Sequence, residues 1–316
     1  MTLLEEGSSG ADQERTGAPN TFIVGSPKCG TTYLAAWLAT SRDAFVPTVK
    51  EPGFFTDTRQ YRLGMQHYRA RYYADVARER LVVDATPWYL YPANVPERIA
   101  ENVGTSVKVI VLLREPARRA VSMYHERVGR RRETRTFEQV VEDEMAAADP
   151  VAAVAREFNP DHFQHHVLCG LYAEPVQRYL DVFGPDNTLV LTSEELWGQT
   201  ETVRARLTTF LGIDVPDAPE RSVNPAWQPK LEIVESVLSR AESSTSRLRQ
   251  VVAARPGAVR VIRGVLDWAS AWNQSSAEYE LPDPELMGRL RRWYQPANER
   301  LESVLGRPLD EWRVHH

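Results

Sequence analysis

TFIVGSPKCGTTYLAAWLAT, residues 21 to 40, is the most informative stretch of this chain for its architecture. The stretch opens with a short apolar run that ends at Gly25, continues with the polar loop SPKCG, and closes with apolar residues at helical spacing. This order predicts a buried strand, a tight turn and a helix that begins near Thr31.

Three more short β-branched runs lie further along the chain: LVVD at 81 to 84, VKVIVLL at 107 to 113 and TLVL at 188 to 191. Helical patterns separate these runs. Buried strands that alternate with helices predict an α/β fold, with a mostly parallel sheet covered by helices on both faces. After about residue 198 only helical patterns follow, and we expect a helical C-terminal cap.

The chain shows no long Gly/Ser or charged spacer that would separate two domains. We therefore expect one domain over residues 21 to 316, with the α/β core at 21 to 198 and the mainly helical cap at 199 to 316. Residues 1 to 20 are polar, and they predict a disordered leader.

Composition excludes several classes of protein. The 38 Lys+Arg residues and 43 Asp+Glu residues give a formal net charge of -5, which does not indicate a nucleic-acid binder. The two cysteines, Cys29 and Cys169, form no disulfide framework, so we expect a reducing, cytoplasmic location. Because no apolar run approaches the roughly 20 residues that cross a bilayer, we expect no membrane span.

The loop after the first strand has the residues of an anion site. Backbone N–H groups and the positive end of a helix dipole meet there, Lys28 adds a charge, and Gly30 allows close approach. Thr31 and Thr32 can donate hydroxyl hydrogen bonds or cap the helix. GSPKCGTT is not a Walker A motif, because its lysine precedes the second glycine by two residues. On this loop alone, an ordinary turn with capping threonines remains the alternative.

A second anion site is indicated by VIVLLREPARRAVSMYHE, residues 109 to 126. Arg114 ends the apolar strand, Pro116 suits the first turn of the next helix, and Ser122 lies eight residues after Arg114. The guanidinium and the hydroxyl can converge on one phosphate. Since open parallel sheets bind ligands beyond the carboxyl ends of their strands, we expect both sites at one edge and a ligand with two anionic groups.

FIVGSPKCGTTYL and VIVLLREPARRAVSMYHE together resemble the two phosphate-binding elements of the sulfotransferases that use 3′-phosphoadenosine 5′-phosphosulfate (PAPS). The resemblance is to the branch with heparan-sulfate sulfotransferases and bacterial relatives, and it covers roughly residues 21 to 312. It implies a P-loop-NTPase-like sheet. It also implies in-line transfer of a sulfuryl group to a hydroxyl, rather than an amine, of a small-molecule or carrier-protein-bound acceptor, with no metal and with 3′-phosphoadenosine 5′-phosphate (PAP) as the product.

The same resemblance assigns residues to the two phosphate sites. The 5′ phosphosulfate would be held by Lys28, Cys29, Gly30, Thr31 and Thr32, with Cys29 contributing its backbone N–H and not its thiol. The 3′ phosphate would be held by Arg114 and Ser122. Lys28 would also be catalytic, because its charge can follow the negative charge onto the leaving phosphate oxygen.

A base must take the acceptor's proton, and Glu51 in KEPGFF, residues 50 to 55, matches the base of the heparan-sulfate-type relatives. Lys50 would hold substrate or tune that carboxylate. Some of those relatives carry a histidine two residues after the glutamate, where this chain has Gly53. Without the resemblance, Lys50 and Glu51 would be interpreted as a surface pair before a proline turn.

Asp84, at the end of LVVD, has three interpretations. Asp84 and Trp88 would contact the acceptor, as the matching segment does in relatives. Asp84 would instead hold magnesium, as a Walker B aspartate does. In the third interpretation, which we prefer, Asp84 or Thr86 caps a helix that starts at Pro87.

Two other functions are consistent with parts of the sequence. A P-loop kinase or NTPase would use the first loop and LVVD as nucleotide motifs, but the position of the lysine disfavours it. A non-catalytic nucleotide-binding module is disfavoured by the presence of Lys28 and Glu51. HFQHHVLC, residues 162 to 169, has ligand types at helical spacing, yet no second cluster completes a zinc site, and we expect no metal.

Only aromatic residues give a cue to the acceptor. They are Phe54, Phe55, Trp88 and Tyr89, and they suit an apolar ring as well as a sugar face. From the negative charge and the lack of an anchor we expect modification of a bacterial natural product or a lipid-like alcohol rather than a polysaccharide.

Overall fold

The computed structural model describes residues 17–49, 51–147, 149, 165–219 and 282–313. The chain divides into two compact units. Of the described residues, the first unit takes those up to Leu113 and those from Ala173 to Ala218, and the second takes those from Arg114 to Tyr172 and from Pro219 onward. The single domain expected from the sequence, with its core ending and its helical cap beginning near residue 198, stays a prediction.

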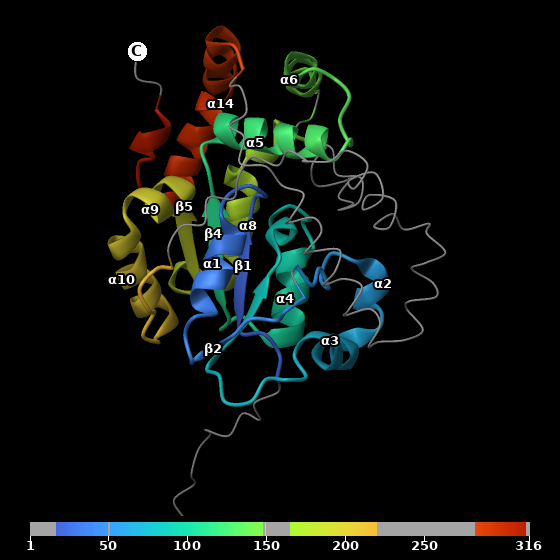
Figure 1. Ribbon diagram of the computed structural model, residues 1–316, viewed down its shortest axis with the longest axis vertical. Helices are drawn as coiled ribbons and strands as arrows, with labels where there is room; N and C mark the ends of the chain where they lie inside the picture. Colours follow the sequence, from blue (N-terminus) through green and yellow to red (C-terminus); the bar gives the residue numbers. More distant parts are fainter. Residues whose placement is uncertain (1–16, 50, 148, 150–164, 220–281, 314–316) are drawn as a thin grey trace, which may run out of the picture. The chain divides into compact units, whose positions relative to one another are not determined.

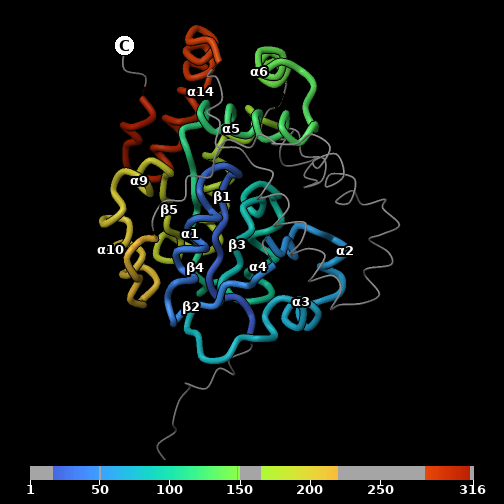
Figure 2. The backbone as a smooth tube through the Cα atoms, in the orientation of Figure 1, coloured from blue at the N-terminus to red at the C-terminus, as the bar shows by residue number. Residues whose placement is uncertain are grey.

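A five-stranded parallel sheet is the centre of the first unit (Figures 1 and 2). Its strands are β1 (Thr21–Gly25), β2 (Ala44–Phe45), β3 (Leu81–Ala85), β4 (Lys108–Leu113) and β5 (Thr188–Thr192). They are ordered β2-β3-β1-β4-β5, and every neighbouring pair is parallel. The predicted α/β fold with a parallel sheet is therefore confirmed, and β2 is a strand that the sequence did not predict.

The register of β1 and β4 places Gly25 opposite Leu112. Gly25 has a φ of +150°, and a Cβ at this position would stand 2.1 Å from the carbonyl oxygen of Leu112. The next backbone N–H, that of Ser26, donates to the same oxygen at 3.1 Å. Only glycine fits where β1 passes β4 this closely, so the two strands reach the first loop in fixed alignment.

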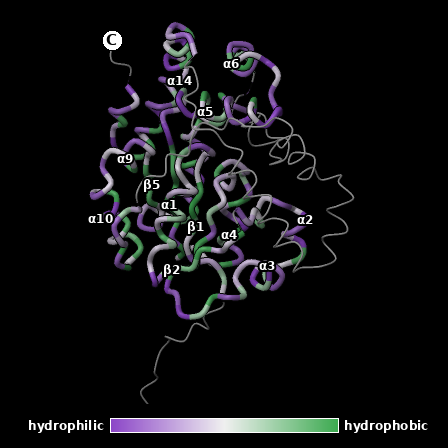
Figure 3. Tube along the Cα trace, viewed as in Figure 1, coloured by the Kyte–Doolittle hydropathy of each residue, from purple (hydrophilic) through white to green (hydrophobic). Residues whose placement is uncertain are grey.

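Apolar residues cover both faces of the sheet, and Figure 3 shows hydrophobic residues along β1. On one face, α1 (Thr31–Leu38) and α10 (Thr200–Leu211) pack in a core with the strands. That core contains Ile23, Leu34, Trp37, Val83, Ile110, Leu112, Leu191 and Leu207. The alternate residues of β1 and β4, which point to the opposite face, are also fully buried: Phe22, Val24, Val109 and Val111. Burial on both faces explains why these strands are continuous apolar runs.

The remaining elements of the first unit are short helices and turns. They are α2 (Thr58–Tyr61), α3 (Gly64–Tyr72), η1 (Pro87–Leu90), α4 (Val95–Val103), α8 (Ala173–Phe183), η3 (Pro185–Asn187) and α9 (Ser193–Gly198). Among them, α8 contacts α4, β4 and β5.

The second unit is helical where the structure describes it. Its elements are α5 (Pro116–Gly129), α6 (Phe137–Met145), η2 (Leu168–Gly170), α14 (Pro284–Leu305) and η4 (Asp310–Trp312). A core of its own joins α5, α6 and α14. Gly170 lies against the ring of Tyr294, where a Cβ would come within 2.6 Å of a ring carbon, and the Tyr294 hydroxyl donates to the Val167 carbonyl at 2.6 Å.

Several sequence predictions fall partly on undescribed residues. Of the predicted leader, residues 1–16 lie outside the described residues, whereas the Asn20 backbone N–H donates to the Val82 carbonyl at 3.0 Å. His162 also lies outside them, and His166 is buried beside Glu144 with 3.3 Å between Nδ1 and Oε1. In the described part of the chain no three metal-ligating side chains gather, and no helix there is long and apolar enough to cross a membrane.

Candidate active site

The first candidate element is the loop from Ser26 to Gly30, which joins β1 to α1. Lys28 has a φ of 75° and Gly30 a φ of 92°, so two positions of this five-residue turn adopt the left-handed conformation. A side chain on Gly30 would meet Leu196 at 3.1 Å and Trp197 at 3.3 Å. The loop thus keeps a non-glycine residue, Lys28, in a backbone conformation that costs about 1–2 kcal/mol.

Hydroxyl groups from other elements hold this loop in place. Ser193 Oγ, at the start of α9, lies 2.9 Å from the carbonyl oxygen of Cys29 and 3.1 Å from that of Leu113. The hydroxyls of Tyr91 and Ser26 are 2.6 Å apart. Cys29 is fully buried in the core. Because Leu113 is the last residue of β4, the Ser193 hydroxyl joins the end of that strand to the loop after β1.

The two threonines after the loop do not act as predicted caps. Gly30 is the N-cap of α1, and it makes no side-chain cap hydrogen bond. Thr31 is buried and Thr32 is exposed, and both line a pocket. The capping interpretation of these residues is therefore wrong for this structure, and their hydroxyls face a cavity.

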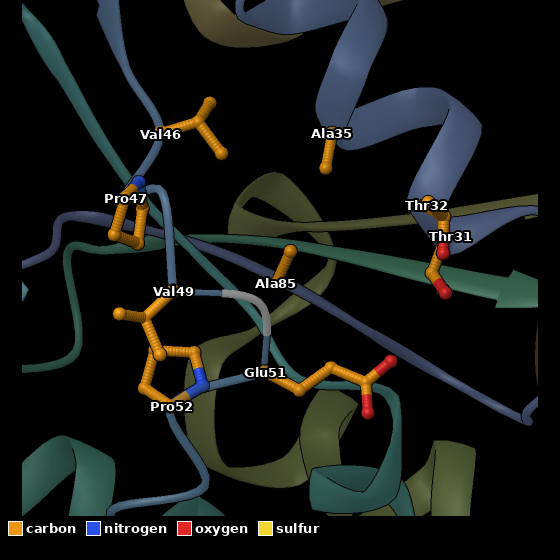
Figure 4. Close-up of a pocket in the computed structure, with 9 residues that line it drawn as sticks. All are labelled: Thr31, Thr32, Ala35, Val46, Pro47, Val49, Glu51, Pro52 and Ala85. Carbon is orange, nitrogen blue, oxygen red and sulfur yellow. The ribbon is translucent and has the colours of Figure 1, made fainter. Parts of the chain in front are cut away.

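That pocket has a volume of about 130 Å³, and most of its lining residues come from α1 and from the segment after β2. It is lined by Thr31, Thr32, Ala35, Val46, Pro47, Val49, Glu51, Pro52 and Ala85. Figure 4 shows the Glu51 side chain extending towards the side lined by Thr31 and Thr32. The sequence predicted Glu51 and the two threonines as site residues from segments about 20 positions apart, and the structure brings them to one cavity.

Glu51 shares a backbone feature with Lys28. Its φ is 52°, and among the described residues only Lys28, Glu51 and Arg131 are non-glycine residues with a positive φ. Such residues cluster at functional sites, because the surrounding structure has to maintain the unfavourable conformation. The two residues predicted as catalytic are thus two of the three that show this feature.

Of the other predicted acceptor residues, those that the structure describes do not line the pocket. Lys50 lies outside the described residues. Trp88 is half-buried and is not among the lining residues, and Asp84 is fully buried. The aromatic residues Phe54, Phe55 and Tyr89 are also fully buried, so these rings pack inside the protein instead of presenting a surface to an acceptor.

Asp84 is the centre of a buried hydroxyl cluster. Its carboxylate accepts hydrogen bonds from Thr86 Oγ1 at 2.6 Å, from the Tyr89 hydroxyl at 3.0 Å and from the Tyr68 hydroxyl. Burial raises the pKa of Asp84 from 3.8 to about 6, although these three hydrogen bonds lower it, and the negative charge of Glu51 adds to the rise. The predicted helix start at Pro87 is found as η1, with Thr86 at its N-cap, but the Thr86 side chain makes no cap hydrogen bond and donates to Asp84 instead.

The predicted 3′-phosphate residues lie in the second unit. Arg114 directly follows Leu113, and its carbonyl accepts from the Tyr172 hydroxyl at 3.1 Å. Ser122 lies on α5 and is partly exposed. The first turn of α5 is capped by Glu115, whose carboxylate accepts from the backbone N–H groups of Ala117 and Arg118. Their joint role in binding a phosphate stays a prediction.

Sequence reasoning missed the residues that support the site. Ser193, Tyr91 and Tyr68 carry hydroxyls whose partners lie between 16 and 164 positions away along the chain, and Thr86 was named only as a helix cap. The only sequence signal was Asp84 itself, a carboxylate at the end of an otherwise apolar strand, which required polar partners in the interior.

Comparison with known proteins gives consistent relationships. The model of the family described as sulfotransferase domain matches residues 18–229. The chain is 23% identical to heparan sulfate glucosamine 3-O-sulfotransferase 5 of Mus musculus. The similarity extends over 293 residues, which are 92% of this chain and 73% of that protein. It is 26% identical to heparan sulfate glucosamine 3-O-sulfotransferase 3A1 of Mus musculus over 211 residues, which are 67% of this chain and 48% of that protein. The crystal structure of a sulfotransferase from Alicyclobacillus acidocaldarius is similar with a TM-score of 0.62 and 23% identity, covering 94% of this chain and 99% of that one.

Proposed function

Because this chain belongs to the sulfotransferase family, we propose that it transfers the sulfuryl group of PAPS to a hydroxyl of a small-molecule or carrier-bound acceptor. The acceptor oxygen attacks the sulfur atom, and the bond between sulfur and the bridging phosphate oxygen breaks. The products are a sulfate ester, PAP and one proton, which a base of the protein removes. Lys28 and Glu51 supply the two charged groups that this reaction requires.

The loop from Ser26 to Gly30 is the site of the 5′ phosphosulfate in this proposal. Lys28 and Gly30 have a positive φ directly before the start of α1, and backbone N–H groups of such a turn at a helix N-terminus suit an anion. The Lys28 ammonium stabilises the negative charge that develops on the leaving phosphate oxygen. Arg114 and Ser122 hold the 3′ phosphate, as the resemblance to the family implies.

Glu51 accepts the proton of the attacking hydroxyl. The observation that carries this assignment is the pocket in which the Glu51 carboxylate extends towards Thr31 and Thr32, the residues that follow the Lys28 loop (Figure 4). An acceptor hydroxyl in this pocket would lie between the base and the donor loop. This arrangement favours transfer over binding alone, because a module that only held nucleotide would not need a carboxylate near the sulfuryl group.

The pocket walls favour an apolar acceptor end. Six of the lining residues are apolar: Ala35, Val46, Pro47, Val49, Pro52 and Ala85. Among the described lining residues Glu51 carries the only charge, and it would repel a sulfate or carboxylate on the acceptor. At about 130 Å³ the pocket is smaller than the roughly 300–1,000 Å³ of sites that enclose a drug-sized ligand. We therefore propose that it takes the hydroxyl-bearing end of an uncharged, largely apolar alcohol.

Thermal unfolding of the protein with each nucleotide tests the donor. PAP at about 100 times its dissociation constant should stabilise the folded state by about 2.7 kcal/mol, and ATP with magnesium should not. Stabilisation by ATP with magnesium but not by PAP would contradict the proposal and favour a kinase or NTPase.

Transfer from radiolabelled PAPS tests the acceptor. We would compare octan-1-ol and 2-naphthol with an uncharged sugar and a sulfated oligosaccharide. The two apolar alcohols should become labelled fastest, and Glu51→Gln should slow labelling by about 10²–10⁴-fold, the usual contribution of a general base, while PAP binding is retained. Preferred labelling of the sulfated oligosaccharide would overturn the acceptor assignment and leave the reaction class intact.

A further inference from the structure

Two buried hydroxyls hold the turn that carries Glu51. After Glu51, whose φ is 52°, the chain turns through Pro52 and Gly53 to Phe55. The Gly53 backbone N–H donates to Thr86 Oγ1 at 3.3 Å, and the Phe55 backbone N–H donates to the Tyr89 hydroxyl at 3.3 Å. The acceptors of both N–H groups therefore come from the segment that follows β3.

Both hydroxyls in turn donate to one carboxylate. Thr86 Oγ1 is 2.6 Å from Asp84 Oδ1, and the Tyr89 hydroxyl is 3.0 Å from Asp84 Oδ2. An ionised carboxylate only accepts hydrogen bonds, and a hydroxyl has a single proton to donate. Asp84 therefore accepts the hydrogen bond that each hydroxyl donates, and the oxygen lone pairs of Thr86 and Tyr89 remain to accept from the N–H groups of the turn.

We propose that Asp84 is a positioning residue, which acts through Thr86 and Tyr89 to hold the turn that directs Glu51 into the pocket. This inference rests on the proposed function, because Glu51 has to be the base for its position to matter. Asp84 itself touches neither the pocket nor the reacting groups, since it is fully buried and does not line the cavity.

A role in stability alone does not account for this arrangement. Among the described residues Asp84 forms no ion pair, and a buried carboxylate without one costs free energy that an apolar side chain of similar size would avoid. Two of its three hydroxyl partners, Thr86 and Tyr89, also accept hydrogen bonds from the backbone of the Glu51 turn. The hydroxyl of the third partner, Tyr68, is hydrogen-bonded to the Tyr73 hydroxyl at 3.2 Å. The Tyr73 hydroxyl also donates to the Val83 carbonyl at 3.3 Å. Tyr73 thus belongs to the same cluster without contacting the turn.

Hydrogen exchange of the full chain tests the positioning directly. Thr86→Val should speed exchange of the Gly53 amide, and Tyr89→Phe that of the Phe55 amide, by about three- to tenfold, because each loses one hydrogen bond. Thr86→Ser keeps the hydroxyl and should restore wild-type exchange at Gly53. Tyr73→Phe is the matched control, since it also removes a buried hydroxyl, and it should leave both amides unchanged.

Turnover measurements test whether the turn acts through Glu51. With the best alcohol of the acceptor panel, Thr86→Val and Tyr89→Phe should each lower kcat about tenfold and leave the KM for PAPS unchanged, whereas Tyr73→Phe should keep the wild-type kcat. In a Glu51→Gln background, adding Thr86→Val should cause no further loss, because the group being positioned is already absent.

The outcomes separate this inference from the proposed function. Unchanged exchange at Gly53 and Phe55, or a full additional loss on adding Thr86→Val to Glu51→Gln, overturns the positioning role of Asp84. If Glu51→Gln keeps the wild-type rate, the base assignment in the proposed function fails instead, and the role of Asp84 in directing that base fails with it.

Discussion

Lys28 and Glu51 combine a functional group with an unfavourable backbone conformation. Lys28 has a φ of 75° and Glu51 a φ of 52°, and glycine would adopt either conformation at lower cost. The fold supports both residues with hydroxyl contacts: Ser193 to the carbonyl of Cys29, next to Lys28, and Thr86 to the N–H of Gly53, two residues after Glu51. A side chain retained where glycine would be more stable suggests that the side chain itself is required.

Replacing Lys28 separates its charge from its backbone strain. Lys28→Ala and Lys28→Gly both remove the ammonium, and we expect both to reduce turnover of PAPS to background. Lys28→Gly should be the more stable of the two by about 1 kcal/mol, because alanine pays the cost of a positive φ. Urea unfolding together with labelled-PAPS turnover measures both effects. Wild-type turnover in the glycine variant would show that the ammonium is not catalytic.

Asp84 should make the stability of the protein depend on pH. Burial raises its pKa from 3.8 to about 6 in the folded state. The folded protein therefore holds this proton more tightly than the unfolded chain does. Its contribution to stability is fully present below about pH 4 and is lost as the pH rises through about 6. At about 1.4 kcal/mol per pKa unit, the loss amounts to about 3 kcal/mol.

Asp84→Asn removes this titration. We expect the unfolding free energy of the variant, relative to wild type, to increase by about 3 kcal/mol between about pH 4 and pH 7, as measured by urea unfolding at each pH. The comparison with wild type cancels the pH dependence that other acidic groups contribute. Glu133 is one such group, because hydrogen bonds from Arg135 lower its pKa to about 2. A difference that is the same at both pH values would show that Asp84 titrates normally.

At the scale of elements, the sequence predicted the parts of the sheet that are buried on both faces. β1, β3, β4 and β5 are short, mostly apolar runs, and their predicted bounds agree with the observed bounds to within one residue. β2 was missed because Ala44 and Phe45 form a two-residue strand that is only half-buried, and a pattern of period two needs a longer run to be recognised.

The candidate site was predictable only where local sequence determines chemistry. The Lys28 loop and Glu51 were identified from their residues and the family resemblance. The support for the Glu51 turn was not predictable, because Thr86 and Tyr89 reach the backbone N–H groups of Gly53 and Phe55 only through the fold. Phe54 and Phe55 are aromatic cues to the acceptor in the sequence, yet they are fully buried, and sequence alone does not distinguish an aromatic ring in the interior from one in a binding site.

Gly25 fixes the alignment of β1 with β4, and substitution should disrupt the sheet. A Cβ on Gly25 would stand 2.1 Å from the Leu112 carbonyl oxygen, so one of the two strands would have to move. We expect Gly25→Ala to lower the unfolding free energy by more than about 4 kcal/mol. Gly198→Ala is the matched control, because a Cβ there meets nothing within 4 Å, and its unfolding free energy should change by less than about 1 kcal/mol. Equal stability of the two variants would contradict the observed register.

The overall charge of the protein does not account for anion binding. The net charge of -5 would repel a donor with two anionic groups. Binding of PAPS therefore requires local positive groups, and the proposed function names Lys28 for one end of the donor and Arg114 for the other. Substituting either residue should then weaken binding only of those nucleotides that carry the phosphate at its own end of the donor.

Removing one phosphate from the ligand tests this division. Arg114→Ala should weaken binding of PAP about ten- to a hundredfold, because a charge-assisted hydrogen bond to phosphate contributes about 1.5–3 kcal/mol. AMP has the 5′ phosphate but no 3′ phosphate, so the same substitution should leave its affinity unchanged, as titration calorimetry would measure. Arg42→Ala, which removes an exposed arginine just after α1, should alter neither affinity. If Arg114→Ala weakened PAP and AMP equally, the arginine would act as a general attractive charge, and the 3′ phosphate would have to be bound elsewhere.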